Sequence, residues 1–417
     1  MYHEITQCRM CGCQELAPII DLGMQALTGV FPRSRDERIT TGPLELVKCD
    51  ERAGGCGLTQ LRHSYDATEM YGQNYGYRSG LNQSMVRHLH ASVARIVDTV
   101  PLGKSDLVID IGANDSTTLQ GYPADGPDLV GIDPTGAKFR QHYPERIRLI
   151  PDFFSAATFQ REFGTRRAKV ITSIAMLYDL EEPGRFFQDV REVLADDGVW
   201  VFEQSYLPTM LRVNAYDTIC HEHIEYYGLK QIKWLCDQAG FRILDVELND
   251  INGGSFSVTV GTARSPWKAR TERVNQLLAD EETAGLHTLA PFHAFAQRVR
   301  KHRNELRATL DASRAAGKLT LGLGASTKGN VLLQYCGFSD QDIPAIGEVN
   351  PDKYGSFTPG TLIPILPETE IRARKPDNLL VLPWHFRPTF MQRERDFLEA
   401  GGQLLFPLPE IEFVGHA

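Results

Sequence analysis

The chain has 417 residues, of which 42% are hydrophobic and 23% are charged. These values are ordinary for globular proteins and exclude a disordered, collagen-like or coiled-coil chain, and the length predicts two or three domains. The formal charge of −9 is spread without long runs of one sign, which argues against nucleic acid as a partner. The polar N-terminus does not resemble a signal peptide, and no apolar stretch approaches roughly 18 residues, so we expect a cytoplasmic protein without membrane contact.

Five of the eight cysteines lie near the N-terminus. Cys8 and Cys11 form a CxxC pair, and six residues separate Cys49 from Cys56. Four thiolates suit a closed structural Zn²⁺ site that stabilises a small module, so we expect these four to bind zinc, with Cys13 as an alternative ligand. The other interpretations are reduced thiols without metal, and a zinc ribbon on DNA, which the lack of basic flanking residues disfavours.

The chain divides into three parts. Residues 1–65 are expected to form the zinc module, 66–265 a central domain and 266–417 a C-terminal domain. Within the central domain, 66–105 holds an aromatic, polar segment followed by a helix, because Met85, Leu89, Val93 and Ile96 recur at helical spacing.

Short apolar runs alternate with helical stretches in both larger domains. This alternation predicts βαβ units with parallel sheets, and therefore an α/β fold with two Rossmann-like domains. A helix-prone region at 266–316 separates the two series of strands. The predicted strands are 107–111, 129–133, 170–174 and 199–203 in the central domain, and 319–323, 343–347, 378–382 and 403–406 in the C-terminal domain.

Polar and aromatic residues follow the predicted central strands, where ligands of parallel sheets bind. The first loop lacks GxGxxG and carries acidic side chains where a pyrophosphate needs bare N–H groups. The set therefore favours S-adenosylmethionine, whose sulfonium and amino-acid tail suit carboxylates, over NAD(P). Helix capping is an alternative role for each acid alone, above all for Asp115. The expected cofactor-binding residues are Asp110, Gly112, Asn114, Asp115, Asp133, Asp152, Phe153, Phe154 and Ser173.

Residues 216–227 hold two histidines, two glutamates and three tyrosines. His223 or His221 could act as a general base, with Glu222 or Glu225 to orient it. We call residues 216–227 the string. A metal site in it is disfavoured because it lacks HExxH and no third ligand is evident. The remaining alternative is a polar linker between domains.

Several motifs occur together and in order: the four cysteines, Asp-Ile-Gly-Ala-Asn-Asp at 110–115, Cys-His-Glu-His-Ile-Glu-Tyr-Tyr at 220–227, Asn-Gly-Gly-Ser at 252–255 and Gly-Ala-Ser-Thr-Lys-Gly at 324–329. Across the whole chain they resemble the three-domain, zinc-containing, S-adenosylmethionine-dependent sugar C-methyltransferases. The resemblance implies methylation at C-3 of a nucleotide-linked (dTDP or GDP) 4-keto-6-deoxy sugar, in the biosynthesis of branched deoxysugars.

The resemblance also implies roles for single residues. His223 matches the general base, with Glu222 beside it, and Tyr178 stands where some members have a histidine near the sugar. Tyr75 or Tyr77 matches an aromatic residue that closes over the substrate. His221 is the next candidate for the base. The expected substrate-binding residues are Arg78, Asn82, Cys220, Ser326, Lys328 and Lys353.

Two positions depart from the family pattern. Ser116 replaces a glycine in the cofactor loop, and Cys220 stands where a tyrosine is frequent. At 322–329, glycines, hydroxyls and one lysine open a predicted helix, which favours a contact with the nucleotide diphosphate over a plain strand–helix turn.

The expected chemistry is consistent with these residues. A ketone at C-4 acidifies the C-3 hydrogen, so an imidazole can remove it, and zinc is structural. The alternatives are an O- or N-methyltransferase acting on another small metabolite, a non-catalytic zinc-dependent binding protein, and an NAD-dependent sugar oxidoreductase. We expect a monomer or a small homo-oligomer.

Overall fold

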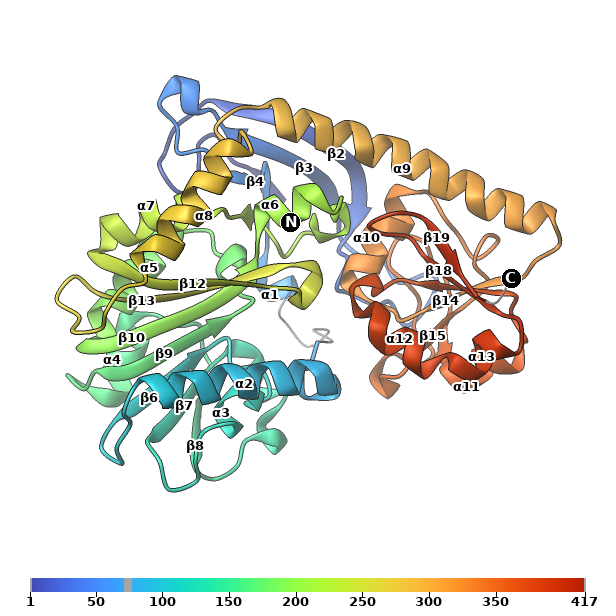
Figure 1. Cartoon of the computed structure of the whole chain (residues 1–417). Helices are drawn as coiled ribbons and strands as arrows, with labels where there is room; N and C mark the ends of the chain where they lie inside the picture. Colours follow the sequence, from blue (N-terminus) through green and yellow to red (C-terminus); the bar gives the residue numbers. More distant parts are fainter. Residues whose placement is uncertain (1, 71–76, 416–417) are drawn as a thin grey trace.

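The computed structural model describes residues 2–70 and 77–415, which form three modules, each built on a sheet (Figure 1). The N-terminal module lies above the central domain, and the C-terminal domain lies beside both. Across these described ranges no helix has the length and apolar character needed to span a membrane.

The N-terminal module is built on an antiparallel sheet in the order β11-β4-β3-β2. Its fourth strand, β11, belongs to the string at 216–227 and pairs with β4 through Glu225–Gln60 and Tyr226–Thr59. A distant segment therefore completes the sheet of the zinc module. The elements are β1 Tyr2–Glu4, β2 Leu16–Ala26, β3 Thr41–Cys49, β4 Thr59–Leu61, β5 His63–Tyr65, α1 Ala67–Met70 and β11 Glu225–Tyr226.

The central domain has a seven-stranded sheet in the order β12-β13-β10-β9-β6-β7-β8. The strands from β6 to β10 are parallel, whereas β13 runs antiparallel to both β10 and β12. The strands are β6 Leu107–Ile111, β7 Asp128–Ile132, β8 Ile147–Ile150, β9 Ala168–Ile174, β10 Leu194–Ser205, β12 Phe241–Asn249 and β13 Ser255–Thr262. The helices are α2 Gln83–Thr99, α3 Thr117–Gln120, α4 Ala156–Phe163, α5 Pro183–Val193, α6 Leu207–Arg212 and α7 Leu229–Ala239.

The predicted α/β fold of the central domain is confirmed. Every residue of β6 is buried, as a strand with helices on both faces requires. The predicted apolar face of α2 is buried, and Asn82 caps this helix by accepting a hydrogen bond from Ser84 N–H. The antiparallel pair β12–β13 was not predicted, because its residues alternate between buried and half-buried positions and do not form a continuous apolar run.

The C-terminal domain has a six-stranded sheet in the order β16-β15-β14-β17-β18-β19, in which only β19 is antiparallel. Its strands are β14 Thr320–Leu323, β15 Ile346–Glu348, β16 Ile365–Pro367, β17 Asn378–Val381, β18 Gln403–Phe406 and β19 Glu412–Val414. Its helices are α10 Thr327–Tyr335, α11 Glu368–Ala373, α12 Arg387–Arg393 and α13 Arg395–Glu399.

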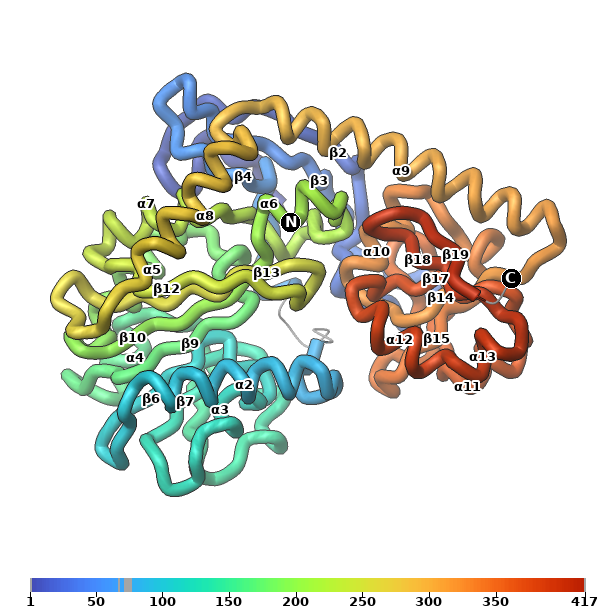
Figure 2. Tube along the Cα trace, viewed as in Figure 1, coloured from blue at the N-terminus to red at the C-terminus, as the bar shows by residue number. Residues whose placement is uncertain are grey.

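The helix-prone region divides into α8 Thr271–Thr283 and the long α9 Ala290–Ala315. Helix α9 extends over the top of the molecule from the central domain to the C-terminal domain (Figure 2), and it contacts β2, α6 and β14. It therefore connects all three modules.

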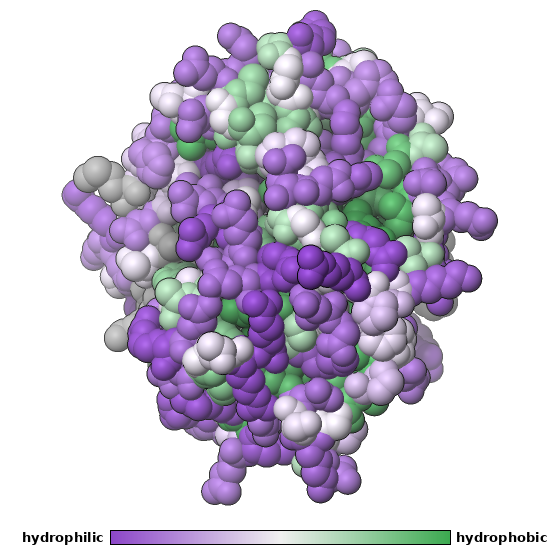
Figure 3. All heavy atoms as spheres, turned by 90° about the vertical axis from the view of Figure 1, so that its left-hand side faces the viewer, coloured by the Kyte–Doolittle hydropathy of each residue, from purple (hydrophilic) through white to green (hydrophobic). Residues whose placement is uncertain are grey.

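Apolar side chains fill the spaces between sheets and helices, and one continuous cluster extends from β2 and β3 through the string into the C-terminal sheet. Hydrophilic side chains dominate the end of the molecule formed by the central domain, with apolar residues scattered among them (Figure 3). The buried apolar contacts thus hold the string against two modules at once.

Candidate active site

The loop after β6 is shaped by two backbone features. Gly112 has φ of 73°, and a Cβ there would come within 3.2 Å of Met176 Cγ, so both conformation and space favour glycine. Ser116 also has positive φ, 64°, a conformation that glycine adopts at lower cost than serine. The bare backbone at Gly112 and the carboxylates around it fit a cationic amino-acid cofactor.

Asp133, at the end of β7, braces this loop. Its Oδ2 accepts a hydrogen bond from Asn114 N–H at 2.7 Å, and its Oδ1 accepts from Thr135 N–H at 2.6 Å. Asp110 lies deeper in β6 and accepts from Thr172 Oγ1 at 2.6 Å, and burial raises its pKa to about 7. Asp110 therefore acts within the sheet, whereas Asp133 stands at its edge.

The segment before α2 rests on the cofactor loop. Asn114 Nδ2 donates to the carbonyl of Tyr77, Ser79 N–H donates to Asn114 Oδ1, and Gly80 N–H donates to Asp115 Oδ2. The exposed ring of Tyr77 stands at this edge, whereas Tyr75 lies outside the described residues.

Other predicted residues of this segment and loop are occupied by structural contacts. Asp115 also accepts from Thr117 N–H and Oγ1 in the first turn of α3, but Ser116 occupies the N-cap position, so Asp115 is not the cap that the alternative predicted. Arg78 contacts His142 Nε2 at 2.9 Å and lies 3.6 Å from Asp115 Oδ2. Asn82 is engaged as the cap of α2.

The remaining predicted cofactor residues divide into exposed and buried groups. Asp152 and Phe153 are exposed, and Phe154 packs edge-on against Phe186. Ser173 is fully buried, and its hydroxyl accepts from Trp200 Nε1 at 2.9 Å. The Ser173 side chain therefore serves the core, while Phe153 leaves an aromatic face at the sheet edge.

His223 has the geometry of a base. Its Nδ1 lies 3.1 Å from the carbonyl of Thr218, which can only accept, so Nδ1 carries the proton and Nε2 is left as the acceptor. Burial, together with the charge of Lys328, lowers the His223 pKa to about 3, so the imidazole is neutral near pH 7. The Tyr178 ring lies 4.2 Å away between centroids, and both residues line a small cavity with Thr218 and Tyr226.

Glu222 points toward the zinc module, and Cys220 near it is fully buried. Glu222 Oε2 accepts from Thr28 Oγ1 at 3.2 Å, and a Cβ at Gly29 would lie 2.2 Å from Glu222 Oε1, so the approach requires glycine. Burial raises the pKa of both Glu222 and Cys220. The zinc module therefore touches the string next to His223.

His221 lies in a different environment from His223. It is fully buried with its ring edge-on to Tyr65 of β5, at 4.6 Å between centroids, and burial lowers its pKa to about 4. Its role is packing between the string and the zinc module, which leaves His223 as the histidine beside Tyr178.

The C-terminal domain approaches the string with α10. Lys328 Nζ donates to the carbonyl of Asn252 at 2.8 Å, and Ser326 caps α10 by accepting from Gly329 N–H. Lys353 Nζ donates to the carbonyl of Ala325 at 2.8 Å. Of the three predicted substrate residues in the C-terminal domain, Ser326 is thus committed to a helix cap, and the two lysines retain further N–H donors.

The four cysteines predicted to bind zinc form one cluster. Their sulfurs lie within 4.8 Å of one another, and the Cys8–Cys56 and Cys11–Cys49 pairs are each 3.6 Å apart. Tetrahedral Zn–S bonds of about 2.3 Å place sulfurs about 3.8 Å apart, so the cluster fits zinc. Among the described residues this is the only such cluster, and it does not include Cys13.

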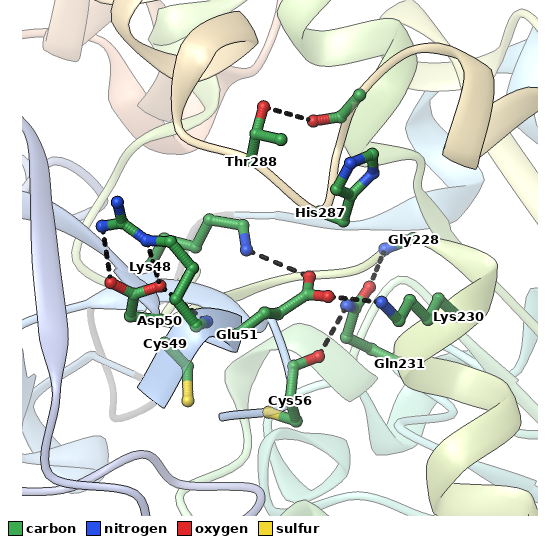
Figure 4. Close-up of polar contacts among 12 residues, drawn as sticks. Lys48, Cys49, Asp50, Glu51, Cys56, Gly228, Lys230, Gln231, His287 and Thr288 are labelled. Atoms are coloured by element: carbon green, nitrogen blue, oxygen red, sulfur yellow. Dashed lines mark hydrogen bonds and ion pairs between the residues drawn. The ribbon is translucent and has the colours of Figure 1, made fainter. Parts of the chain in front are cut away.

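Figure 4 shows how the zinc module contacts α7. Gln231 Nε2 donates to the carbonyl of Cys56 at 3.1 Å, and Glu51 accepts from both Lys48 and Lys230. A cavity of about 170 Å³ lies at this junction, and the paired Glu51 and Lys230 are among the residues that line it. The contacts fix the zinc module on the central domain.

Sequence reasoning missed a polar group at the end of β10. His88 Nε2 lies 2.7 Å from Glu203 Oε1, and Glu203 Oε2 accepts from Asn249 Nδ2 at 2.8 Å. Three separate elements supply these residues, so no local motif could have indicated them.

Comparisons with known proteins assign the modules. Family models match residues 8–71 as a zinc binding domain, 85–246 as a methyltransferase domain and 250–409 as a C-methyltransferase C-terminal domain. The C-methyltransferase NovU of Streptomyces niveus is 30% identical over 97% of this chain and 96% of its own. The chain belongs to this C-methyltransferase family. It is an S-adenosylmethionine-dependent C-methyltransferase with a zinc-binding module, and its substrate is a small molecule.

Two solved structures are similar to part of this chain. The 1,6-didemethyltoxoflavin-N1-methyltransferase of Burkholderia thailandensis, with bound S-adenosylhomocysteine, is 14% identical and covers 44% of this chain and 80% of its own, with a TM-score of 0.33. An S-adenosylmethionine-dependent methyltransferase of Clostridium acetobutylicum is 11% identical and covers 42% and 92%, also with a TM-score of 0.33.

Proposed function

We propose that this C-methyltransferase methylates C-3 of a nucleotide-linked (dTDP or GDP) 4-keto-6-deoxy sugar, in branched deoxysugar biosynthesis. The observation that carries the proposal is the orientation of His223. Its Nδ1–H is bound by the Thr218 carbonyl, so Nε2 is the acceptor, held beside Tyr178 at the junction of three modules. A C-methyltransferase needs such a base because carbon must lose a proton before it can accept a methyl group.

The residues have distinct roles in this proposal. His223 Nε2 takes the C-3 proton, which the neighbouring C-4 carbonyl acidifies. Tyr178 and Tyr77 line the substrate side, and burial beside His223 raises the pKa of Glu222. Bound S-adenosylmethionine supplies the methyl group. We also propose that the three domains meet at residues 65/66 and 265/266.

We propose that the ends of the central strands hold the cofactor through Gly112, Asn114, Asp115 and Asp133, with Phe153 as an aromatic surface. Lys328 and Lys353 of the C-terminal domain supply positive charge on the side where the nucleotide sugar binds. The carboxylates stand on the central domain and the lysines on the C-terminal domain. The cationic sulfonium cofactor therefore faces negative side chains, and the anionic nucleotide sugar faces positive ones.

The test is a panel of dTDP- and GDP-linked 4-keto-6-deoxy sugars with S-adenosylmethionine, analysed by mass spectrometry and NMR. We expect one sugar to gain a methyl group on C-3. The matched control is the same sugar with a hydroxyl at C-4, which should not react because its C-3 hydrogen is not acidic. A methyl group found on oxygen or nitrogen would contradict the proposal.

Metal analysis of the same sample tests the zinc site. We expect roughly one zinc ion per chain, lost in Cys11→Ser and retained in Cys13→Ser. Zinc loss in Cys13→Ser would move the ligand set to the alternative cysteine.

A further inference from the structure

Lys328 reaches out of its own domain. It lies in the first turn of α10, immediately after β14, where the sequence pattern favours a diphosphate contact. In the structure its ammonium donates to the carbonyl of Asn252 at 2.8 Å, at the turn between β12 and β13. The charge of this lysine is therefore placed at the central domain.

The same junction anchors the base. Asp217 and Thr218 are consecutive residues of the 3₁₀ helix η6, Tyr216–Thr218. Asp217 Oδ2 accepts from Trp384 Nε1 of the C-terminal domain at 2.8 Å, and the Thr218 carbonyl holds His223 Nδ1. Helix α10 packs against η6, so the helix that carries Lys328 lies on the segment that orients His223.

The electrostatics agree with this placement. Burial is the largest cause that lowers the His223 pKa, and the positive charge of Lys328 is the second. Burial also lowers the Lys328 pKa, and the charge of Asp217 opposes that effect. The charged or titratable groups that interact with Lys328 are Asp217, Cys220, His223 and His385. Asp217 Oδ1 has no hydrogen-bond partner among the described residues, so this carboxylate can stabilise the ammonium.

A cation at this place serves the reaction. When a neutral, weak base takes a proton from carbon, negative charge develops on the adjacent carbonyl oxygen, and a fixed donor at that oxygen lowers the barrier. The C-4 oxygen is two bonds from C-3, so a group that binds it must lie near the base.

We propose that Lys328 is a catalytic residue whose ammonium donates a hydrogen bond to the C-4 carbonyl oxygen of the sugar and stabilises the enolate. This inference rests on the proposed function. His223 Nε2 takes the C-3 proton, the C–H electron pair becomes the C-3–C-4 double bond, and the carbonyl π pair moves to oxygen, while Lys328 keeps its protons. The carbonyl forms again when C-3 takes up the methyl group, the sulfonium–methyl bond breaks with its electron pair left on sulfur to give S-adenosylhomocysteine, and His223 returns its proton to water.

The first test is exchange at C-3 in D₂O with a saturating nucleotide-linked 4-keto sugar, followed by NMR, together with kcat and KM. We expect Lys328→Met to lower exchange and kcat by roughly 10²-fold to 10³-fold, with KM within about threefold, and Lys328→Arg to recover part of the loss. Exposed Lys318→Met is the control and should match the wild type. A KM raised tenfold or more with normal exchange would overturn the proposal in favour of the diphosphate role.

The second test needs no substrate. The His223 pKa is measured by NMR in labelled protein, for the wild type and for Lys328→Met. Removing the positive charge should raise the His223 pKa, because the imidazolium is then less disfavoured. An unchanged pKa would overturn the proposal. A wild-type protein that exchanges C-3 of no sugar would contradict the proposed function, and the His223 titration would still decide whether the ammonium faces the base.

Discussion

The central sheet and the C-terminal sheet share a strand order but differ in what stands at their carboxyl ends. Both place the third, second, first, fourth and fifth strands of their series side by side. In both, an acid at the end of the second strand accepts a hydrogen bond from an N–H of the loop after the first strand: Asp133 from Asn114 at 2.7 Å, and Glu348 from Ala325 at 2.9 Å. An acid at this position is therefore a brace in either fold, and its presence alone does not indicate a ligand.

The difference lies in the first loop. Both first loops begin with a glycine at positive φ, Gly112 and Gly324, but the central sheet adds Asp115, whereas the C-terminal sheet adds Lys328 at the start of α10 and, nearby, Lys353. The first edge suits a cation and the second an anion, and the string with His223 lies where α10 meets the central domain. In the proposed function, the charges that follow the first strand, more than the fold, assign the cofactor to one edge and the substrate to the other.

The largest expected effect belongs to neither edge but to the base between them. His223→Asn should lower turnover by roughly 10³-fold, because the amide cannot take a proton, while S-adenosylmethionine affinity stays within about twofold. Steady-state kinetics and calorimetry measure both quantities. His221→Asn is the matched control, and a similar loss of turnover without loss of folding would give His221 the role of base.

Substitution of Asp133 and of Glu348, the two acids that bind the first loop of each sheet, tests the comparison directly. Asp133→Ala should weaken S-adenosylmethionine binding by roughly fiftyfold, as expected for loss of hydrogen bonds to a charged group. Glu348→Ala should leave this affinity within about twofold, although both variants lose a brace. Calorimetric titration of the cofactor measures the two values, and equal losses would contradict the assignment of one edge to each ligand.

A smaller effect concerns pH. The His221 pKa is about 4 when folded and about 6.5 when unfolded, so the unfolded chain binds a proton first as the pH falls. His221 should therefore cost about 2 kcal/mol of stability between pH 7 and pH 5. His221→Phe keeps the ring against Tyr65 and removes this contribution. Urea unfolding at both pH values measures it, and parallel losses in the two proteins would refute the prediction.

The smallest expected effect concerns Asn82, in the segment before α2 that rests on the loop after β6. Asn82→Ala should lower stability by about 1 kcal/mol, because Asn82 caps α2. Asn82→Asp keeps the acceptor and should restore most of the loss. If Asn82→Ala raises the KM for the sugar and leaves stability unchanged, the side chain contacts substrate instead.

Strands buried on both faces were predictable from sequence. The prediction for 107–111 has the bounds of β6, and that for 403–406 has the bounds of β18, because continuous apolar runs leave one interpretation. Strand β11 has two residues and exists through its pairing with β4, so no local pattern could indicate it.

The site was predictable only in part. The cysteine spacing predicted a cluster that the structure confirms, because four thiols within one small module have few ways to meet. The different surroundings of His221 and His223 depend on the path of the string between two modules. The position of Lys328 near Asn252 depends on how domains distant in sequence pack, which spacing does not encode.

The most direct test of the central claim is deuterium uptake at C-3 of the accepted 4-keto sugar, measured by NMR in D₂O without the methyl donor. The account predicts that the wild-type protein introduces deuterium at C-3 and that His223→Asn, still folded and still binding the sugar, does not. Uptake at the wild-type rate in His223→Asn would show that another group removes the hydrogen and would contradict the account.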